Sequence, residues 1–245
     1  MTSEPTLAVL RLGRVPYAEA LQLQHQLREQ RIDRRIDRDL LLLLEHEPTV
    51  TLGRGTRPES LPLSPDELAR LGLTVMEVER GGDVTWHGPG QLVGYPIIDL
   101  QGHRADLHWY LRQIEEAVIA TLASLGIVAS RNPGYTGVWT GGRKIASIGV
   151  HVRQWVTSHG FALNVSNSLE GFGCIVPCGI PGVEMTTVER ELVTSGARRP
   201  GAGNLWNQAL GATAAAFGRT FERQPVETKL ADLLPEGTGV ALKAY

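Results

Sequence analysis

Two segments that lie far apart in this 245-residue chain carry the side chains best suited to covalent chemistry. The first is residues 142–149, which include Lys144, and the second is the tripeptide Pro177-Cys178-Gly179. A lone cysteine is more often a small buried apolar residue than a nucleophile, but here a proline that fixes φ precedes the thiol and a glycine that admits a close substrate follows it. We therefore predict a rigid, accessible thiol at Cys178 that the amine of Lys144 activates.

A third segment, residues 80–91, is rich in glycine and polar side chains and lies between two expected strands. Its spacing matches neither a Walker phosphate loop nor a dinucleotide fingerprint. Its glycines let the backbone approach a narrow substrate, while Thr85, His87 and Gln91 supply polar side chains. The segment is therefore predicted to bind substrate. The alternative is a long hairpin turn whose polarity is incidental.

The composition is that of a folded protein without a strongly charged surface. The hydrophobic content of 42% is enough for a full core, and 24 Lys and Arg against 26 Asp and Glu give a net charge of -2, which argues against a general nucleic-acid binder. Two cysteines are too few for a disulfide framework, so we expect a reducing, cytoplasmic location. The chain start lacks the apolar stretch of a signal peptide, and no apolar run reaches transmembrane length.

The elements that must position these segments follow from the apolar pattern. Alternating or continuous apolar runs predict strands at 7–12, 39–45, 74–79 and 91–100. Apolar residues at helical spacing, with capping residues, predict helices at 17–28, 64–71, 107–125 and 204–221. Ser64 and Glu67 form a predicted capping box, and Asp106 and Gly126 mark the two ends of the longest helix.

Three further short strands, at 135–139, 144–152 and 161–165, predict an antiparallel meander. Simple alternation along the middle strand puts Lys144 on the face of Ala146 and Val150, at the strand's start, where it could reach over a pocket. Because strands and helices interleave without regular βαβ spacing, we predict an α+β fold with a mixed sheet covered by helices. The sequence shows no clean domain boundary, so residues 1–245 are expected to form a single catalytic domain.

Together, residues 80–91, 142–149, 160–165 and 177–179 resemble the lipoyl(octanoyl) transferases of the biotin and lipoate protein ligase superfamily. The matching motifs span roughly residues 79–184. The resemblance implies a largely antiparallel mixed sheet covered by helices. It also implies a cytoplasmic enzyme of protein lipoylation that moves an octanoyl group, through a cysteine thioester, from octanoyl-acyl carrier protein to a lysine of an acceptor protein. The implied acceptors are the lipoyl domains of 2-oxoacid dehydrogenase E2 subunits and the glycine-cleavage H protein, with no membrane or nucleic-acid partner.

The resemblance also implies roles for individual residues. Cys178 matches the acyl-thioester nucleophile, and Lys144 matches the residue that favours its thiolate form. The positions that match substrate-binding segments are Arg80, Gly81, Gly82, Asp83, Val84, Thr85, Trp86, His87, Ser147, Ile148, Gly149, Gly160, Phe161 and Ala162. An acyl thioester is already activated, so neither ATP nor another cofactor is expected. No second pair of ligands accompanies Cys174 and Cys178, so no metal is expected either.

Several details stay open at this level. The oxyanion donors are backbone amides near Cys178 and Gly179 or near Ser147, and His87 either relays a proton or only holds its loop. His151 and His159 are expected to have no chemical role. Four candidates for the wall of an octanoyl slot, each of which could equally be ordinary core, are Ile145, Ile148, Phe161 and Val84. Four arginines that either steer acidic partners or are merely solvated are Arg54, Arg57, Arg143 and Arg153.

Two rival functions compete with acyl transfer. One is an ATP-dependent lipoate or biotin ligase on the same fold, which would not need Cys178. The other is a non-catalytic module that binds acylated protein. The segment from Arg190 to Gly203 is rich in arginine and glycine, and it is interpreted as a flap or a linker.

Overall fold

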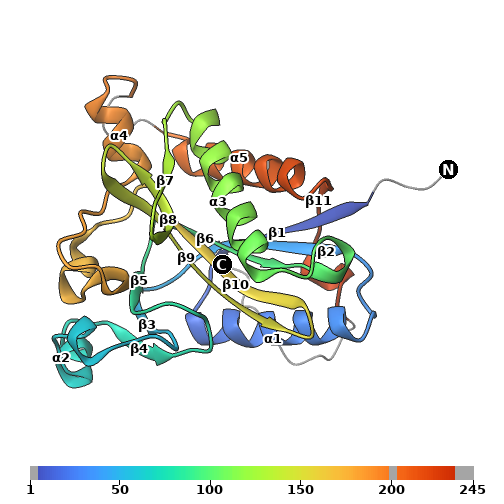
Figure 1. Cartoon of the computed structure of the whole chain (residues 1–245), viewed down its shortest axis with the longest axis horizontal. Coiled ribbons are helices and arrows are strands. Elements are labelled where there is room, and N and C mark those ends of the chain that lie inside the picture. The colour runs from blue at the N-terminus through green and yellow to red at the C-terminus, as the bar shows by residue number, and fades with distance from the viewer. Residues whose placement is uncertain (1–4, 199–202, 235–245) are drawn as a thin grey trace.

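A mixed eight-stranded sheet forms the centre of the computed structural model, which describes residues 5–198 and 203–234 (Figure 1). Strand β1 runs parallel to β11 and β2, and every other pair in this sheet is antiparallel, which confirms the predicted mixed, largely antiparallel sheet. Its strands, in spatial order, are β11 (Gln224–Glu227), β1 (Thr6–Arg14), β2 (Asp39–Glu45), β6 (Gln91–Ile97), β10 (Val156–Asn164), β9 (Arg143–Arg153), β8 (Tyr135–Thr140) and β7 (Ser130–Asn132).

Helices cover both faces of this sheet. Helix α1 (Tyr17–Ile32) packs on one face, and α3 (Leu107–Ser124) and α5 (Leu205–Thr220) lie together on the other (Figure 1). Two separate apolar cores result, one under each layer of helix. The Asp106 side chain accepts a hydrogen bond from the Trp109 amide at 3.0 Å and so begins α3 where the sequence predicts.

A smaller sheet, beside the large one, was not predicted. It consists of β4 (Thr74–Glu77), β3 (Thr49–Leu52) and β5 (Thr85–His87). The predicted helix at 64–71 is α2 (Pro65–Arg70), and its capping box is present. Strand β5 lies inside the glycine-rich segment, so the interpretation of that segment as one continuous turn is wrong. Three residues with two polar members carry too little apolar pattern to reveal a strand.

The other predicted elements are confirmed, with small shifts at their ends. The last strand of the meander begins five residues earlier than predicted, at Val156. The segment from Arg190 to Gly203 is not simply a flap or linker, because α4 (Val188–Thr194) covers its beginning, with Thr187 as the N-cap. Residues 199–202 of that segment lie outside the described residues. The single-domain assignment remains a prediction.

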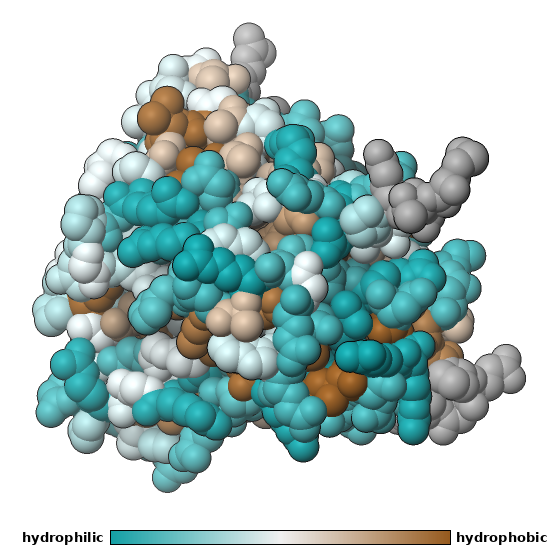
Figure 2. All heavy atoms as spheres, turned by 45° about the vertical axis from the view of Figure 1, so that its right-hand side comes forward, coloured by the Kyte–Doolittle hydropathy of each residue, from teal (hydrophilic) through white to brown (hydrophobic). Residues whose placement is uncertain are grey.

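Figure 2 shows one face on which hydrophilic side chains dominate and apolar ones form small, separate patches. Leu107, which the sequence pattern places on the apolar face of its helix, is instead 41% exposed at the helix start. Within the described ranges, none of the helices has the length and apolar character needed to cross a membrane.

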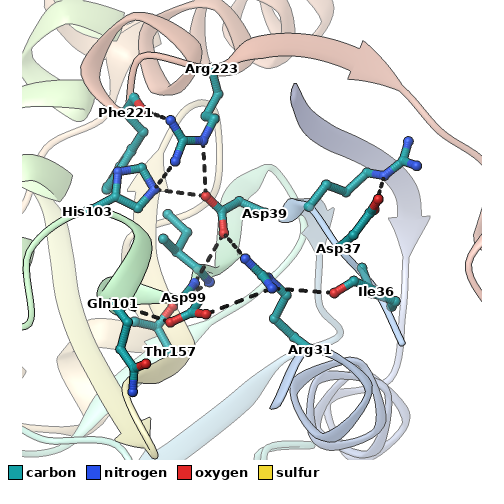
Figure 3. A network of polar contacts seen from close by, with 12 residues as sticks. Arg31, Ile36, Asp37, Asp39, Asp99, Gln101, His103, Thr157, Phe221 and Arg223 are labelled. Carbon is teal, nitrogen blue, oxygen red and sulfur yellow. Dashed lines mark hydrogen bonds and ion pairs between the residues drawn. The ribbon is translucent and has the colours of Figure 1, made fainter. Parts of the chain in front are cut away.

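A buried carboxylate ties several chain segments together at the start of strand β2. Asp39, at the start of β2, accepts a hydrogen bond from His103 at 2.8 Å and forms ion pairs with Arg31 and Arg223 (Figure 3). Burial alone would raise the pKa of Asp39, but the hydrogen bonds from His103 and from the Asp99 amide, and the nearby charges, lower it below its usual value. These contacts join the end of α1, the start of β2 and the segment after α5.

We expect Asp39→Ala to lower the free energy of unfolding by about 3 kcal/mol, because it removes the buried carboxylate shared by Arg223 and Arg31 and leaves Arg31 with Asp99 at 3.9 Å. Denaturant titration of both proteins measures the loss. Asp37→Ala is the matched control, since its side chain is 82% exposed and, among the described residues, pairs with Arg38 alone, and it should change stability by less than about 0.5 kcal/mol. Equal effects of the two substitutions would contradict this assignment.

Candidate active site

Lys144 reaches its position because strand β9 contains a bulge. Trp139 of β8 pairs with Lys144, whereas the adjacent Val138 pairs with Ala146, so Ile145 is an extra residue on β9. Paired residues of an antiparallel ladder point to the same side of the sheet, and Lys144 Nζ indeed lies 4.9 Å from the centre of the Trp139 ring. Lys144 and Ala146 therefore point to opposite faces, and the prediction that they share a face is wrong.

The predicted amine and thiol meet in space. Lys144 Nζ lies 3.0 Å from Cys178 Sγ and also donates to the Thr136 carbonyl at 3.3 Å. Ser147 Oγ is 3.6 Å from the same sulfur. Lys144 is only 1% exposed, so its contact with the sulfur is little screened by water. The pair can act as a shielded nucleophile with an adjacent cation.

Cys178 sits on a strained turn. Cys178 has φ 56° and ψ 20°, a left-handed conformation that is unusual for a residue with a Cβ, and Gly179 follows with φ 63°. The Cys178 amide donates to the Val84 carbonyl and the Gly179 amide to the Val176 carbonyl, each at 3.0 Å. Both amides named as oxyanion donors are thus already engaged.

A buried carboxylate holds this turn from the side. Asp83 accepts hydrogen bonds from Ser60 Oγ and from the Val84 amide, each at 2.7 Å. It also pairs with Arg57 at 3.5 Å, and Arg57 donates to the Gly179 carbonyl at 3.0 Å. A Cβ at Gly179 would overlap the Asp83 carboxylate. The glycine is required both by its positive φ and by this close approach.

One cavity brings most of the predicted residues together. Alternation along β5 separates them: Thr85 and His87 face the cavity, whereas Val84 and Trp86 pack in the apolar core beneath the small sheet. Gly81 and Ile145 do not line the cavity either, and Ile145 is core. Predicted residues that do line it are Arg80, Gly82, Asp83, Thr85, His87, Lys144, Ser147, Ile148, Gly149, Gly160, Phe161, Ala162 and Cys178.

Sequence reasoning missed several cavity residues. Tyr17 comes from the start of α1, and Val93 and Tyr95 come from β6, where they read as ordinary core residues. Tyr135, which is 46% exposed, also lines the cavity. His159 was expected only to flank a hairpin, but it is buried in the cavity wall with its Nε2 3.6 Å from Glu79.

Burial lowers the pKa of His46 and of His87, beside the cavity. His46 donates from Nδ1 to the Val15 carbonyl at 2.7 Å, and burial lowers its pKa to about 4. Burial and the neighbouring His46 hold the pKa of His87 well below its usual value. His87 forms a hydrogen bond with Gln91 at 2.8 Å, and its ring stacks on that of Tyr17. These contacts favour the interpretation that His87 holds its loop.

Three of the four arginines proposed for partner steering have carboxylate partners. Arg143 forms two close contacts with Glu191, at 2.9 and 3.0 Å, and Arg153 pairs with Glu29 at 2.9 Å. Arg57 pairs with Asp83, as described above. Because these charges are partly neutralised, the steering hypothesis is weakened for them. It stays a prediction for Arg54.

The chain matches the family model described as the lipoyl protein ligase A/B catalytic domain over residues 16–197. It is 46% identical over 244 residues to an octanoyltransferase of Acidobacterium capsulatum, a match that covers 94% of this chain and 96% of that protein. An octanoyltransferase of Solibacter usitatus is 54% identical over 169 residues, covering 69% and 76% of the two chains.

Solved structures show the same fold at low identity. Lipoate-protein ligase A bound with ATP aligns with a TM-score of 0.69 and 17% identity, covering 94% of this chain and 90% of that one. The bi-partite lipoate protein ligase of Thermoplasma acidophilum aligns with a TM-score of 0.67 and 17% identity, covering 94% and 89%. At this identity the likeness concerns the fold alone, and it confirms the predicted ligase-like architecture.

By its fold, its cavity and the match over most of its length, the chain belongs to the lipoyl protein ligase A/B catalytic domain family. Within that family its named relatives are octanoyltransferases, which confirms the predicted acyltransferase class.

We expect Gly179→Ala to slow alkylation of Cys178 by iodoacetamide and to lower octanoyl transfer about tenfold or more, because the new methyl group displaces Asp83 and the turn it holds. Gly182→Ala is the control. Gly182 also has a positive φ, 72°, but a Cβ there meets nothing within 4 Å. If both substitutions lower activity equally, backbone strain alone explains the loss and the role of Asp83 is contradicted.

Stability should rise with pH between about 4 and 6.5. In that window an unfolded chain protonates His46 while the folded protein does not, because its folded pKa is about 4 against the ordinary 6.5. Acidification from pH 7 to 5 should therefore cost about 2 kcal/mol from His46, with His87 and His159 adding in the same direction. Denaturant titrations at several pH values test this. His46→Gln should flatten the slope, and the same change at exposed His108 should not.

Proposed function

We propose that this chain transfers an octanoyl group through a thioester on Cys178, with octanoyl-acyl carrier protein as donor and a lysine of a lipoyl domain as acceptor. The observation that supports this route is the 3.0 Å contact between Lys144 Nζ and Cys178 Sγ on a strained turn that opens onto the cavity. The names of the octanoyltransferase relatives support octanoyl as the acyl group and acyl transfer as the reaction class.

In the first half-reaction the Cys178 thiolate attacks the thioester carbonyl carbon, and the π electrons move to its oxygen. Collapse of this intermediate breaks the bond to the carrier's sulfur. Lys144, as an ammonium group, stabilises the attacking thiolate and gives its proton to the departing carrier thiolate. The products are octanoyl-Cys178, a free carrier thiol and a neutral Lys144 amine.

In the second half-reaction the acceptor lysine attacks the octanoyl-Cys178 carbonyl as a neutral amine. Lys144, now neutral, takes the proton that the attacking nitrogen loses as the amide forms. Cys178 leaves as a thiolate, and the ion pair with Lys144 is restored. Because an amide is more stable than a thioester, the transfer needs no nucleotide.

The octanoyl tail needs an apolar slot. Val93 and Ala162 line the cavity and can supply it, because they pair with each other and Ala162 also pairs with Ser147, on the cavity face of the sheet. Burial of the tail at about 0.8 kcal/mol per methylene amounts to roughly 5 kcal/mol, enough to discriminate against much shorter acyl groups. None of the four candidate wall residues stays in the proposal. Ile145 and Val84 do not line the cavity, and Ile148 and Phe161 pair with each other on the opposite face, in the core under α3 and α5.

Purified protein mixed with octanoyl-acyl carrier protein, without ATP, should gain one octanoyl group on Cys178, detected by intact-mass and peptide mass spectrometry. Cys178→Ser should abolish the labile adduct and turnover. Cys174→Ser is the matched control, because Cys174 is the second free, half-buried cysteine, on the neighbouring turn η3 (Glu170–Cys174), and it should acylate normally.

Lys144→Ala should slow single-turnover acylation by about 100-fold and alter its pH profile, because the thiolate loses its cation. An unchanged pH profile would contradict the role of Lys144. Acyl transfer that needs ATP and free octanoate, and that survives Cys178→Ser, would instead identify an ATP-dependent ligase. Binding of the acylated carrier without any turnover would identify a binding module.

A further inference from the structure

The tetrahedral intermediate of thioester attack carries a negative oxygen that needs hydrogen-bond donors. The amides of Cys178 and Gly179 cannot serve without breaking the turn, since each already donates to a backbone carbonyl at 3.0 Å. Lys144 Nζ and Ser147 Oγ lie 3.0 and 3.6 Å from Sγ and so are placed to serve the sulfur. A donor to the oxygen must come from elsewhere in the cavity wall.

Thr85 has the properties of such a donor. It lines the same cavity as Cys178, is 6% exposed, and its hydroxyl has no hydrogen-bond partner among the described residues. Buried hydroxyls are normally paired, so an unpartnered one at a cavity wall has a hydrogen bond to give to a bound group. It also lies beside the nucleophile, because the carbonyl of the preceding residue, Val84, accepts the hydrogen bond of the Cys178 amide.

The other cavity residues with unpartnered polar atoms are less well placed. His159 pairs with Val150, three rungs of the ladder beyond the Ser147–Ala162 pair that adjoins the sulfur. Arg80 is held by its remaining guanidinium nitrogens to backbone carbonyls and to Thr51, so its free Nε–H has little freedom to follow a substrate. Thr85 is the one hydroxyl of the three, and it can rotate its proton toward an incoming oxygen.

We propose that the Thr85 hydroxyl donates a hydrogen bond to the thioester carbonyl oxygen and that this bond strengthens as the oxygen becomes an anion. The inference rests on the proposed thioester at Cys178. Thr85 forms no covalent bond and keeps its proton throughout. In the second half-reaction the same oxygen becomes negative again when the amine attacks octanoyl-Cys178, so the same hydroxyl serves both steps.

Thr85→Val tests the proposal, because it replaces the hydroxyl with a methyl group of nearly the same shape. We expect about a 100-fold lower single-turnover rate of Cys178 acylation at saturating carrier protein, with little change in the half-saturating concentration. Thr85→Ser, which restores the hydroxyl, should recover most of the rate. The melting temperature of Thr85→Val should be unchanged or higher, because an unpartnered hydroxyl contributes no internal hydrogen bond.

Thr213→Val is the matched control. Thr213 is likewise fully buried with an unpartnered hydroxyl, but it lies on α5 and does not line the cavity. It should retain the wild-type rate. If wild-type protein acquires the adduct and Thr85→Val acquires it equally fast, this proposal is wrong while the thioester stands. A lower melting temperature with no rescue by serine would also overturn it, and absence of any wild-type adduct would refute the thioester itself.

Discussion

The contact between an ammonium group and a sulfur atom is the interaction on which the rest of the site depends. Lys144 and Cys178 reach it from different directions: one from the interior of the large sheet, the other from a turn held by the small sheet and its loops. The lysine is almost fully buried, and such a charge is unfavourable unless a partner compensates it. The Cys178 sulfur, the Thr136 carbonyl and the Trp139 ring surround the lysine nitrogen and can provide that compensation.

The two halves of the site are rigid for different reasons. On the sheet side, β9 lies between β8 and β10, so its backbone is fixed by ladders on both edges. On the turn side, the left-handed conformation of Cys178 is held by the hydrogen bond from its amide to Val84 and by Asp83, Arg57 and Ser60, which surround the adjoining segment. A preorganised site of this kind places the nucleophile before substrate arrives and lowers the entropic part of the barrier.

Much of the architecture was predictable from local pattern, because long amphipathic helices with capping residues and strands with apolar runs are recognisable in the sequence. The small sheet was not, since β3 and β5 are too short to show a period. The motifs identified Lys144 and Cys178 as candidate reactive residues, but the proximity of the two side chains depends on tertiary packing. Tyr17, Tyr95 and His159 carried no signal, because a cavity residue and a core residue look the same in a sequence.

The extra residue at Ile145 lets two residues that are two positions apart face opposite sides of the sheet. In a regular strand Lys144 and Ala146 would share a face, because side chains alternate. Here the bulge leaves both Ile145 and Ala146 in the apolar core while the lysine lies in the cavity. Deleting Ile145 would restore regular pairing with Lys144 still opposite Trp139, so a one-residue gap at this position removes a core side chain but leaves the lysine on its present face.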